Sequence, residues 1–301
     1  MKANAKGQKR RQRKEFLTGI LFIAPGFIGF LVFIFAPVLI SVILSFCKWD
    51  FLQGLSAIRF NGFSNYLKLF NDPWFLSSYF NNIMFTVITV PALTILGLVS
   101  AEIMNRHIFG RSVVRIMFFI PYIASVVAVC TVWQVLLHPG FGPVNSFLKA
   151  IGMQNPPKWL ADLRWSLPSI MIIYIWQNIG YYSVVFLAGL KGIPQELYEA
   201  AAIDGAGSVR QFFSVTVPLI QPTTFFLVTM GIIGSFKVFD HISVLTQGGP
   251  GSSSSVMAYY VYRTAFEEYN MGYANTLAWA LFVLIFIVTV IQFRMQRKFS
   301  R

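Results

Sequence analysis

Six apolar stretches, each long enough to cross a lipid bilayer, constrain this chain more than any other feature of its sequence. A helix needs about 20 apolar residues to span the hydrocarbon core. Hydrophobic residues make up 56% of the 301-residue chain and charged residues only 12%, which leaves too few polar side chains to enclose an ordinary globular core. We therefore expect an all-α integral membrane protein with six transmembrane helices. The stretches cover residues 17–46, 78–103, 113–137, 166–190, 222–246 and 275–293.

The first stretch is longer than one crossing requires, so we expect it to tilt, or to bend near Pro25 or Pro37. Six spans place both ends of the chain on one side of the membrane. That side carries 16 of the 24 Lys and Arg residues, seven of them before Phe16. The positive-inside rule therefore predicts that both termini are cytoplasmic. Topology and anionic lipid explain the basic N-terminal tail, and we do not expect nucleic acid as a partner.

Familiar catalytic and metal-binding motifs are absent from the sequence. Cys47 and Cys130 lie far apart, in or beside apolar stretches, which predicts neither a disulfide framework nor a metal site. No GxxxxGK[ST] sequence is present, so the chain is not expected to bind ATP through a phosphate-binding loop. An intramembrane enzyme would need a convergent acid–base or metal-binding set, which the sequence does not offer.

The loop between the fourth and fifth stretches is predicted to form two short helices in the cytoplasm. Pro194 suits the first turn of a helix over residues 195–203, which is rich in helix-forming residues. Gly205 and Gly207 are expected to end that helix. Ser208 is expected to cap a second helix running to Phe213. Composition alone leaves open whether the first helix docks on another protein or lies on the membrane surface.

The same loop resembles the EAA loop of bacterial ABC importer permeases, whose pattern is EAA-x3-G-x9-I-x-L-P. Glu199-Ala200-Ala201 is followed at the same spacings by Gly205 and by Val215-x-Val217-Pro218, with two apolar replacements. Further segments look like sugar-importer permeases of the maltose-transporter type. These are Arg59-Phe-Asn-Gly-Phe-Ser-Asn-Tyr66, Phe119-Ile-Pro-Tyr122, Leu245-Thr-Gln-Gly-Gly-Pro250 and Tyr262-Arg-Thr-Ala-Phe266.

The resemblance implies a type I ABC importer permease fold in the bacterial cytoplasmic (inner) membrane. It implies a heterodimer with a second, homologous permease, two ATPase subunits that use ATP and Mg, and an extracellular binding protein that delivers a carbohydrate. No cofactor is expected on this chain. The EAA loop would be the coupling helix that sits in an ATPase groove, with Glu199 as its first contact. The other coupling candidates are Tyr198, Ala200, Ala201, Asp204 and Gly205.

On this basis the chain divides into four parts. A basic cytoplasmic tail covers residues 1–15, and the first transmembrane helix with its external loop covers residues 16–77. A permease core of five helices covers residues 78–294 and includes the coupling loop at 192–218. A second cytoplasmic tail covers residues 295–301.

Polar side chains at membrane depth are the candidates for the substrate path. In the fourth stretch Tyr174, Gln177, Asn178 and Tyr181 follow helical i, i+3, i+4, i+7 spacing and share one face. Polar residues inside a membrane usually face the bundle interior, and amides and aromatic rings suit a sugar. The resemblance places the sugar site along this segment. Hydrogen bonding between helices remains the alternative for these side chains.

The third and fifth stretches add further candidates. Lys237 and Asp240 are one helical turn apart and are expected to neutralise each other while facing the pathway or the partner subunit. By resemblance, Phe236 occupies a pathway position and Tyr122 lies near the site, with Ser125 adjacent on the same helix.

Other cargoes and another transporter class remain open at this stage. Glycerol phosphate carriers share this branch, and Lys237 could suit an anionic substrate such as a polyol phosphate or a uronate oligosaccharide. A secondary transporter would require inverted repeats and intramembrane ion ligands, and the sequence displays neither.

Overall fold

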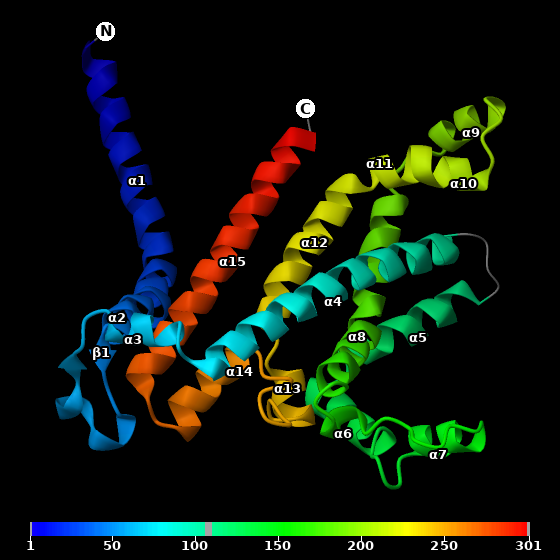
Figure 1. Ribbon diagram of the computed structural model, residues 1–301. Helices are drawn as coiled ribbons and strands as arrows, with labels where there is room; N and C mark the ends of the chain where they lie inside the picture. Colours follow the sequence, from blue (N-terminus) through cyan, green and yellow to red (C-terminus); the bar gives the residue numbers. More distant parts are fainter. Residues whose placement is uncertain (1, 106–109, 300–301) are drawn as a thin grey trace.

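The computed structural model describes residues 2–105 and 110–299, and within them the chain is a bundle of helices of unequal length (Figure 1). The described ends of the chain lie at the same end of the bundle as α9 (Gln195–Ile203). The opposite end carries β1 (Cys47–Lys48), α6 (Val126–Leu136) and α7 (Pro143–Ala150). Arg106 and Arg301, two of the basic residues used to assign the sides, lie outside the described residues.

Four helices are long and apolar enough to cross a bilayer, and two bent helix pairs bring the number to six if each pair forms one span. Three of the four are α4 (Pro73–Asn105), α8 (Ser166–Leu190) and α15 (Met271–Phe299). The bounds of α8 are those expected from the sequence. The other two extend beyond the expected stretches, because neither helix meets a breaker at the end of its apolar segment.

The fourth long span is an arm that runs through α1 (Lys2–Phe30), a π-helical turn at Leu31–Phe35 and α2 (Ala36–Ser45). The wide turn comes directly before Pro37, whose ring removes one hydrogen-bond donor and crowds the preceding turn. Within the described chain, no side chain from Glu15 to Leu44 is buried.

The third expected span is not one helix. It consists of α5 (Arg111–Ile123) and α6, whose axes differ by 96°. Ala124 and Ser125 between them have extended backbone. Pro121 cannot donate to the turn before it, which weakens the end of α5, and α6 packs on α13 (Asp240–Leu245) instead of continuing the line of α5.

The fifth expected span is also interrupted, in its C-terminal part. The helices of the preceding loop, which end with α11 (Val217–Leu219), meet α12 (Gln221–Phe236) at 66°, just before the expected start at residue 222. The helix stops at Phe236, and α13 begins at Asp240 after three intervening residues, the last of which, Phe239, has a φ of −131°. The expectation of a continuous helix to residue 246 was therefore wrong.

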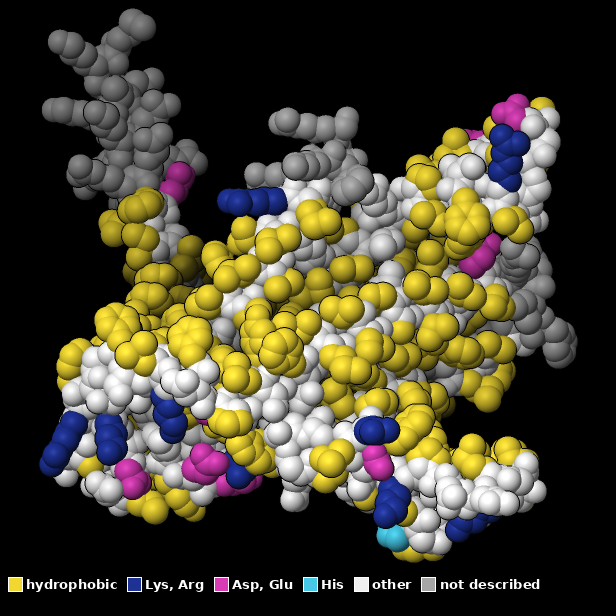
Figure 2. Space-filling model, in the orientation of Figure 1, with side chains coloured by type: hydrophobic (Ala, Val, Ile, Leu, Met, Phe, Trp, Pro, Cys, Tyr) yellow, Lys and Arg dark blue, Asp and Glu magenta, His cyan; other side chains and the backbone are white. Residues whose placement is uncertain are grey.

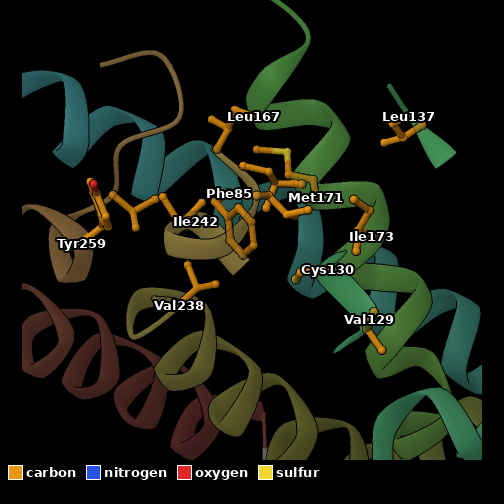
Figure 3. Close-up of a cluster of buried hydrophobic side chains, with 13 residues drawn as sticks. Phe85, Val129, Cys130, Leu137, Leu167, Met171, Ile173, Val238, Ile242 and Tyr259 are labelled. Atoms are coloured by element: carbon orange, nitrogen blue, oxygen red, sulfur yellow. The ribbon is translucent and has the colours of Figure 1, made fainter. Parts of the chain in front are cut away.

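α8 is the central helix of the bundle and packs against α4, α5 and α12. A Cβ added at Gly180 would overlap the Phe118 carbonyl of α5, and one at Gly97 would lie 2.6 Å from Cβ of Tyr182. Small residues at these crossings let the helix backbones approach closely, as is usual for helices packed in lipid. The main apolar cluster joins α4, α6, α8 and α13 around the fully buried Phe85, Ile173 and Ile242 (Figure 3).

Shorter elements close the bundle on the side opposite the termini. After β1 come the 3-10 turns Phe51–Gln53 and Leu55–Ala57, the antiparallel partner strand β2 (Arg59–Phe60) and α3 (Ser64–Leu69). A 3-10 turn at Trp159–Ala161 precedes α8, and α14 (Met257–Tyr262) with a π-helical turn at Arg263–Glu267 precedes α15.

A buried carboxylate connects three of these elements. Asp72 Oδ1 accepts hydrogen bonds from the Trp74 and Phe75 amides at the start of α4. Its Oδ2 accepts from the hydroxyls of Tyr260 in α14 and Tyr273 in α15. Burial acts to raise the pKa of Asp72, but these four hydrogen bonds outweigh burial and hold the pKa below its ordinary value of 3.8.

Candidate functional site

The loop between α8 and α12 folds as the local sequence signals predict. Pro194 stands directly before α9, and the helix ends at Ile203. Gly205 has a φ of +79°. Glycine adopts this conformation readily, whereas a residue with a Cβ would be strained in it. The chain reverses there, so α9 and α10 (Ser208–Gln211) form a knob that projects from the same end of the bundle as the described ends of the chain (Figure 1).

The second helix of this knob differs from the expectation in two respects. Ser208 is not its cap, because Gly207 occupies that position and no side chain bonds the first turn. The helix also does not stop at Phe213. It runs on through a π-helical turn at Phe212–Thr216 into α11, so the turn into α12 comes only at Ile220.

Hydrogen bonds brace the knob internally. The Tyr198 and Thr216 hydroxyls lie 2.9 Å apart, and Thr216 is buried. Gln211 Nε2 donates to the Ala206 carbonyl at 3.0 Å. These bonds connect α9 to the segment that leads into α12, while residues 191–194 connect α9 to α8. α9 is thus attached at both ends to helices of the bundle.

The outer surface of the knob is exposed. Glu199, Ala200 and Asp204 are exposed, and Glu199 Oε1 accepts a hydrogen bond from Gln195 on the preceding turn. Apolar side chains stand beside them, with Ile203 88% and Val209 73% exposed. Ala201 is half-buried and Gly205 lies at the tip of the reversal. Exposed apolar groups around a carboxylate are what a helix needs to enter a partner's groove.

The aromatic candidates for the substrate path meet where α5 crosses α8. The Tyr122 and Tyr181 rings stack with centroids 4.9 Å apart and planes 20° apart. Tyr122 is 40% exposed. Asn178 is half-buried and donates to the Tyr174 carbonyl one turn earlier. Aromatic faces beside an amide are suited to contact a sugar ring.

Two other members of the expected stripe point into the protein. Gln177 is 2% exposed, and its Oε1 lies 2.8 Å from Nε2 of the buried His241 in α13. Tyr174 packs edge-on against the same imidazole with centroids 5.2 Å apart. The Gln177 amide is therefore used between helices in this conformation, which was the alternative interpretation of the stripe. Sequence reasoning missed His241, because nothing in the pattern joins positions 64 residues apart.

The remaining path candidates are separated by the helix breaks. Phe236 is 2% exposed and thus covered by its own chain. Ser125 is exposed but lies beyond the end of α5, so it is not on one helix with Tyr122 as expected. Lys237 and Asp240 are both exposed and do not form the expected ion pair, since the chain leaves helical geometry between them.

No group of three or more His, Cys, Asp or Glu side chains suited to a metal ion occurs within the described ranges 2–105 and 110–299. The candidate site thus has two parts. One is the exposed helical knob at one end of the bundle, and the other is the surface of aromatic and amide side chains at the α5–α8 crossing. α8 connects the two.

Comparison with protein families gives a match to "Binding-protein-dependent transport system inner membrane component" over residues 70–301. The chain is 33% identical over 284 residues to the probable ABC transporter permease protein YurN of Bacillus subtilis, covering 93% of this chain and 95% of that protein. It is 32% identical to the trehalose/maltose transport system permease protein MalF of Thermococcus litoralis, covering 94% and 95%.

Among solved structures, the chain resembles one from a bacterial alginate ABC transporter in complex with an alginate pentasaccharide-bound periplasmic protein. The TM-score is 0.83 at 24% identity, and the match covers 97% of this chain and 98% of that one. At this identity the likeness concerns the fold.

Proposed function

Because the chain belongs to the family of binding-protein-dependent transport system inner membrane components, we propose that it is the permease subunit that conducts a sugar or oligosaccharide into the cell. The family match confirms the resemblance inferred from the EAA loop. The chain is a multi-pass membrane transport subunit and not itself a catalyst. Relatives named for trehalose/maltose and lactose transport support a carbohydrate as the cargo.

The observation that carries the mechanism is the position of α9 between α8 and α12. Two ATPase subunits would bind ATP and Mg and receive α9 in a groove on the cytoplasmic side of a bacterial inner membrane. Closure of the ATPases on ATP would move α9. The Tyr198–Thr216 bond and residues 191–194 would pass that motion to α12 and α8.

The motion of α8 would change access to the substrate path. Tyr181 and Asn178 lie on α8, whereas Tyr122 lies on α5, so a relative shift of the two helices would separate or join the stacked rings. A second, homologous permease would complete the path from the other side. An extracellular binding protein would deliver the sugar.

An anionic sugar is the second candidate cargo. Lys237 is exposed and has no ion pair with Asp240 in the described chain, so its charge is not cancelled as the sequence suggested. One relative, SmoG of Agrobacterium fabrum, is named for sulfoquinovosyl glycerol transport and is 32% identical. A uronate or other acidic sugar would be attracted to such a group.

The test is reconstitution of this chain with its partner permease, ATPases and binding protein in liposomes. Neutral and acidic glycans are then scanned for uptake and for stimulation of ATP hydrolysis by the loaded binding protein. We expect stimulation by one glycan class and no uptake without ATP. Uptake that persists without the ATPases and stops when the ion gradient collapses would instead establish a secondary transporter.

A further inference from the structure

A polar cleft of about 520 Å³ opens on the side of the bundle opposite the described chain ends and α9. The distribution of Lys and Arg assigns this side to the outside. Its walls come from the β1–β2 hairpin and from the turn before α15, and they include Lys48, Trp49, Asp50, Gln53, Arg59 and Glu268. Figure 2 shows Lys, Arg, Asp and Glu side chains gathered over this part of the molecule.

The walls of the cleft are fixed by backbone and buried side-chain contacts. The Phe51 amide donates to the Tyr269 carbonyl at 3.0 Å, and Asp50 forms a β-bridge with Asn270. Asn65 donates to the carbonyls of Ser45 and Cys47 from beneath the hairpin. A ligand would therefore meet a preformed surface, and binding would require little ordering of the protein.

Two cations in the cleft form no ion pair with any residue that the structure describes. Lys48 and Arg59 face each other directly across the two-residue ladder of β1 and β2, and like charges in that position repel. Both residues are exposed. Across residues 2–105 and 110–299, neither forms an ion pair.

The two carboxylates of the cleft are already engaged elsewhere. Asp50 accepts hydrogen bonds from the Leu52 amide and from Gln53 Nε2, each at 3.0 Å. Glu268 lies 3.2 Å from the Arg263 guanidinium, which itself stacks over the Trp74 ring. The Glu268 charge is balanced by Arg263, so Lys48 and Arg59 leave the cleft with one more positive than negative charge when Asp50 is counted, and an anion would be attracted to it.

The surroundings of the cleft favour a protein over a small ligand. Leu55 is 75% and Phe60 81% exposed on the same hairpin, and aromatic and apolar side chains around an arginine are typical of a protein interface. The hairpin lies beside α2 and α15 and not at the α5–α8 crossing. The cleft is therefore separate from the proposed sugar path.

We propose that this cleft receives an acidic side chain of the extracellular binding protein, with Lys48 and Arg59 contacting its carboxylate and the exposed apolar side chains of the hairpin packing around it. The proposal rests on the proposed function, since it assigns a docking position to the partner that delivers the sugar. The paired cations would steer the negatively charged surface of that partner and set its register on the permease.

The experiment titrates the loaded binding protein against the complete transporter in liposomes and records ATP hydrolysis. In the double variant Lys48→Glu with Arg59→Glu, we expect the half-saturating concentration of the binding protein to rise about tenfold or more. Raising the salt concentration should weaken the unsubstituted complex more than the variant. Lys149→Glu with Lys158→Glu, which reverses two charges elsewhere on the same side, is the matched control and should leave the titration unchanged.

Assembly of each variant complex is checked by size-exclusion chromatography, and Lys48→Gln with Arg59→Gln provides a milder pair for which a rise of several-fold is expected. An unchanged half-saturating concentration in both pairs overturns the docking proposal. So does an equal shift in the control pair, which would indicate a general charge effect. If no binding protein stimulates even the unsubstituted complex, the proposed function itself fails, so the two failures are distinguishable.

Discussion

The phenol oxygen of Tyr198 lies 2.9 Å from the buried hydroxyl of Thr216, so the exposed helix α9 is connected by a side chain to the segment that leads into α12. Neither partner of this bond is part of the exposed surface that would meet an ATPase. The bond therefore separates two tasks of the loop, contact with a partner and transmission of its motion, and each task can be tested alone.

Tyr198→Phe removes this bond and keeps the ring. A hydrogen bond of this kind contributes about 1 kcal/mol, so we expect sugar uptake per ATP hydrolysed to fall about fivefold in the reconstituted complex. Thr216→Val should have a similar effect, and the double variant should add little to either. Tyr79→Phe on α4 is the control. Independent, additive effects of the two substitutions would contradict a shared bond.

Glu199→Lys tests the contact surface of the knob. The side chain is exposed, so the substitution should not disturb the fold of the chain, but a lysine would repel a basic residue of the ATPase that pairs with the Glu199 carboxylate in the proposed complex. We expect ATP hydrolysis stimulated by the loaded binding protein to fall at least tenfold while membrane insertion is retained. Glu196→Lys, in the first turn of the same helix, should have a much smaller effect. Normal uptake by Glu199→Lys would count heavily against a coupling role.

Tyr181→Ala tests the stacked pair at the α5–α8 crossing. Loss of the ring removes a contact worth about 1 kcal/mol beyond its buried area, and it removes an aromatic face for the sugar. We expect the maximal uptake rate to fall between threefold and tenfold, whereas Tyr181→Phe, which retains the stack on Tyr122, should keep most of it. If the alanine variant transports at the original rate, these rings do not belong to the substrate path.

Asp72→Asn tests the carboxylate that joins α4, α14 and α15. Since the pKa of Asp72 is lower in the folded chain than its ordinary value of 3.8, its stabilising contribution is complete above about pH 4 and is lost as the pH falls through the folded-state pKa. Hydrogen bonds to a charged group contribute about 1.5–3 kcal/mol. The variant should therefore melt at a lower temperature near neutral pH.

The thermal midpoint of the detergent-solubilised chain, measured between pH 3 and pH 8, checks this expectation. The difference between Asp72→Asn and the unsubstituted chain should narrow as the solution becomes acidic. Asp162→Asn, whose carboxylate accepts one backbone hydrogen bond, from Arg164, is the control and should shift the midpoint less. A constant difference over the whole range would mean that the charge of Asp72 does not matter.

Local signals made parts of this fold predictable from the sequence. Pro194 and Gly205 act on their own backbone, so the start of α9 and the chain reversal after it follow from these two residues. The bounds of α8 follow from its apolar length. The family was inferred from a resemblance, because the spacing of Glu199, Gly205 and Pro218 matches the EAA loop of ABC importer permeases.

The remaining features depend on contacts that a linear pattern does not contain. Hydropathy measures how apolar a segment is but not its direction, so the break at Ser125 and the end of α12 at Phe236 were both taken as continuous helix. Helical spacing placed Gln177 on the same face as Tyr181, but its hydrogen bond to His241 depends on how α13 folds back onto α8. The burial of Phe236 likewise depends on how other parts of the chain pack against it, which the sequence pattern does not contain.

The break between α5 and α6 has a consequence for where lipid can be. A helix that ends leaves its last carbonyl groups without helical donors, and hydrocarbon offers none in return. If this pair crosses the bilayer as one span, the corner at Ala124 and Ser125 must be sheltered by neighbouring polypeptide or wetted by water. In that case lipid chains do not contact this corner, which follows Tyr122 of the stacked pair by two residues.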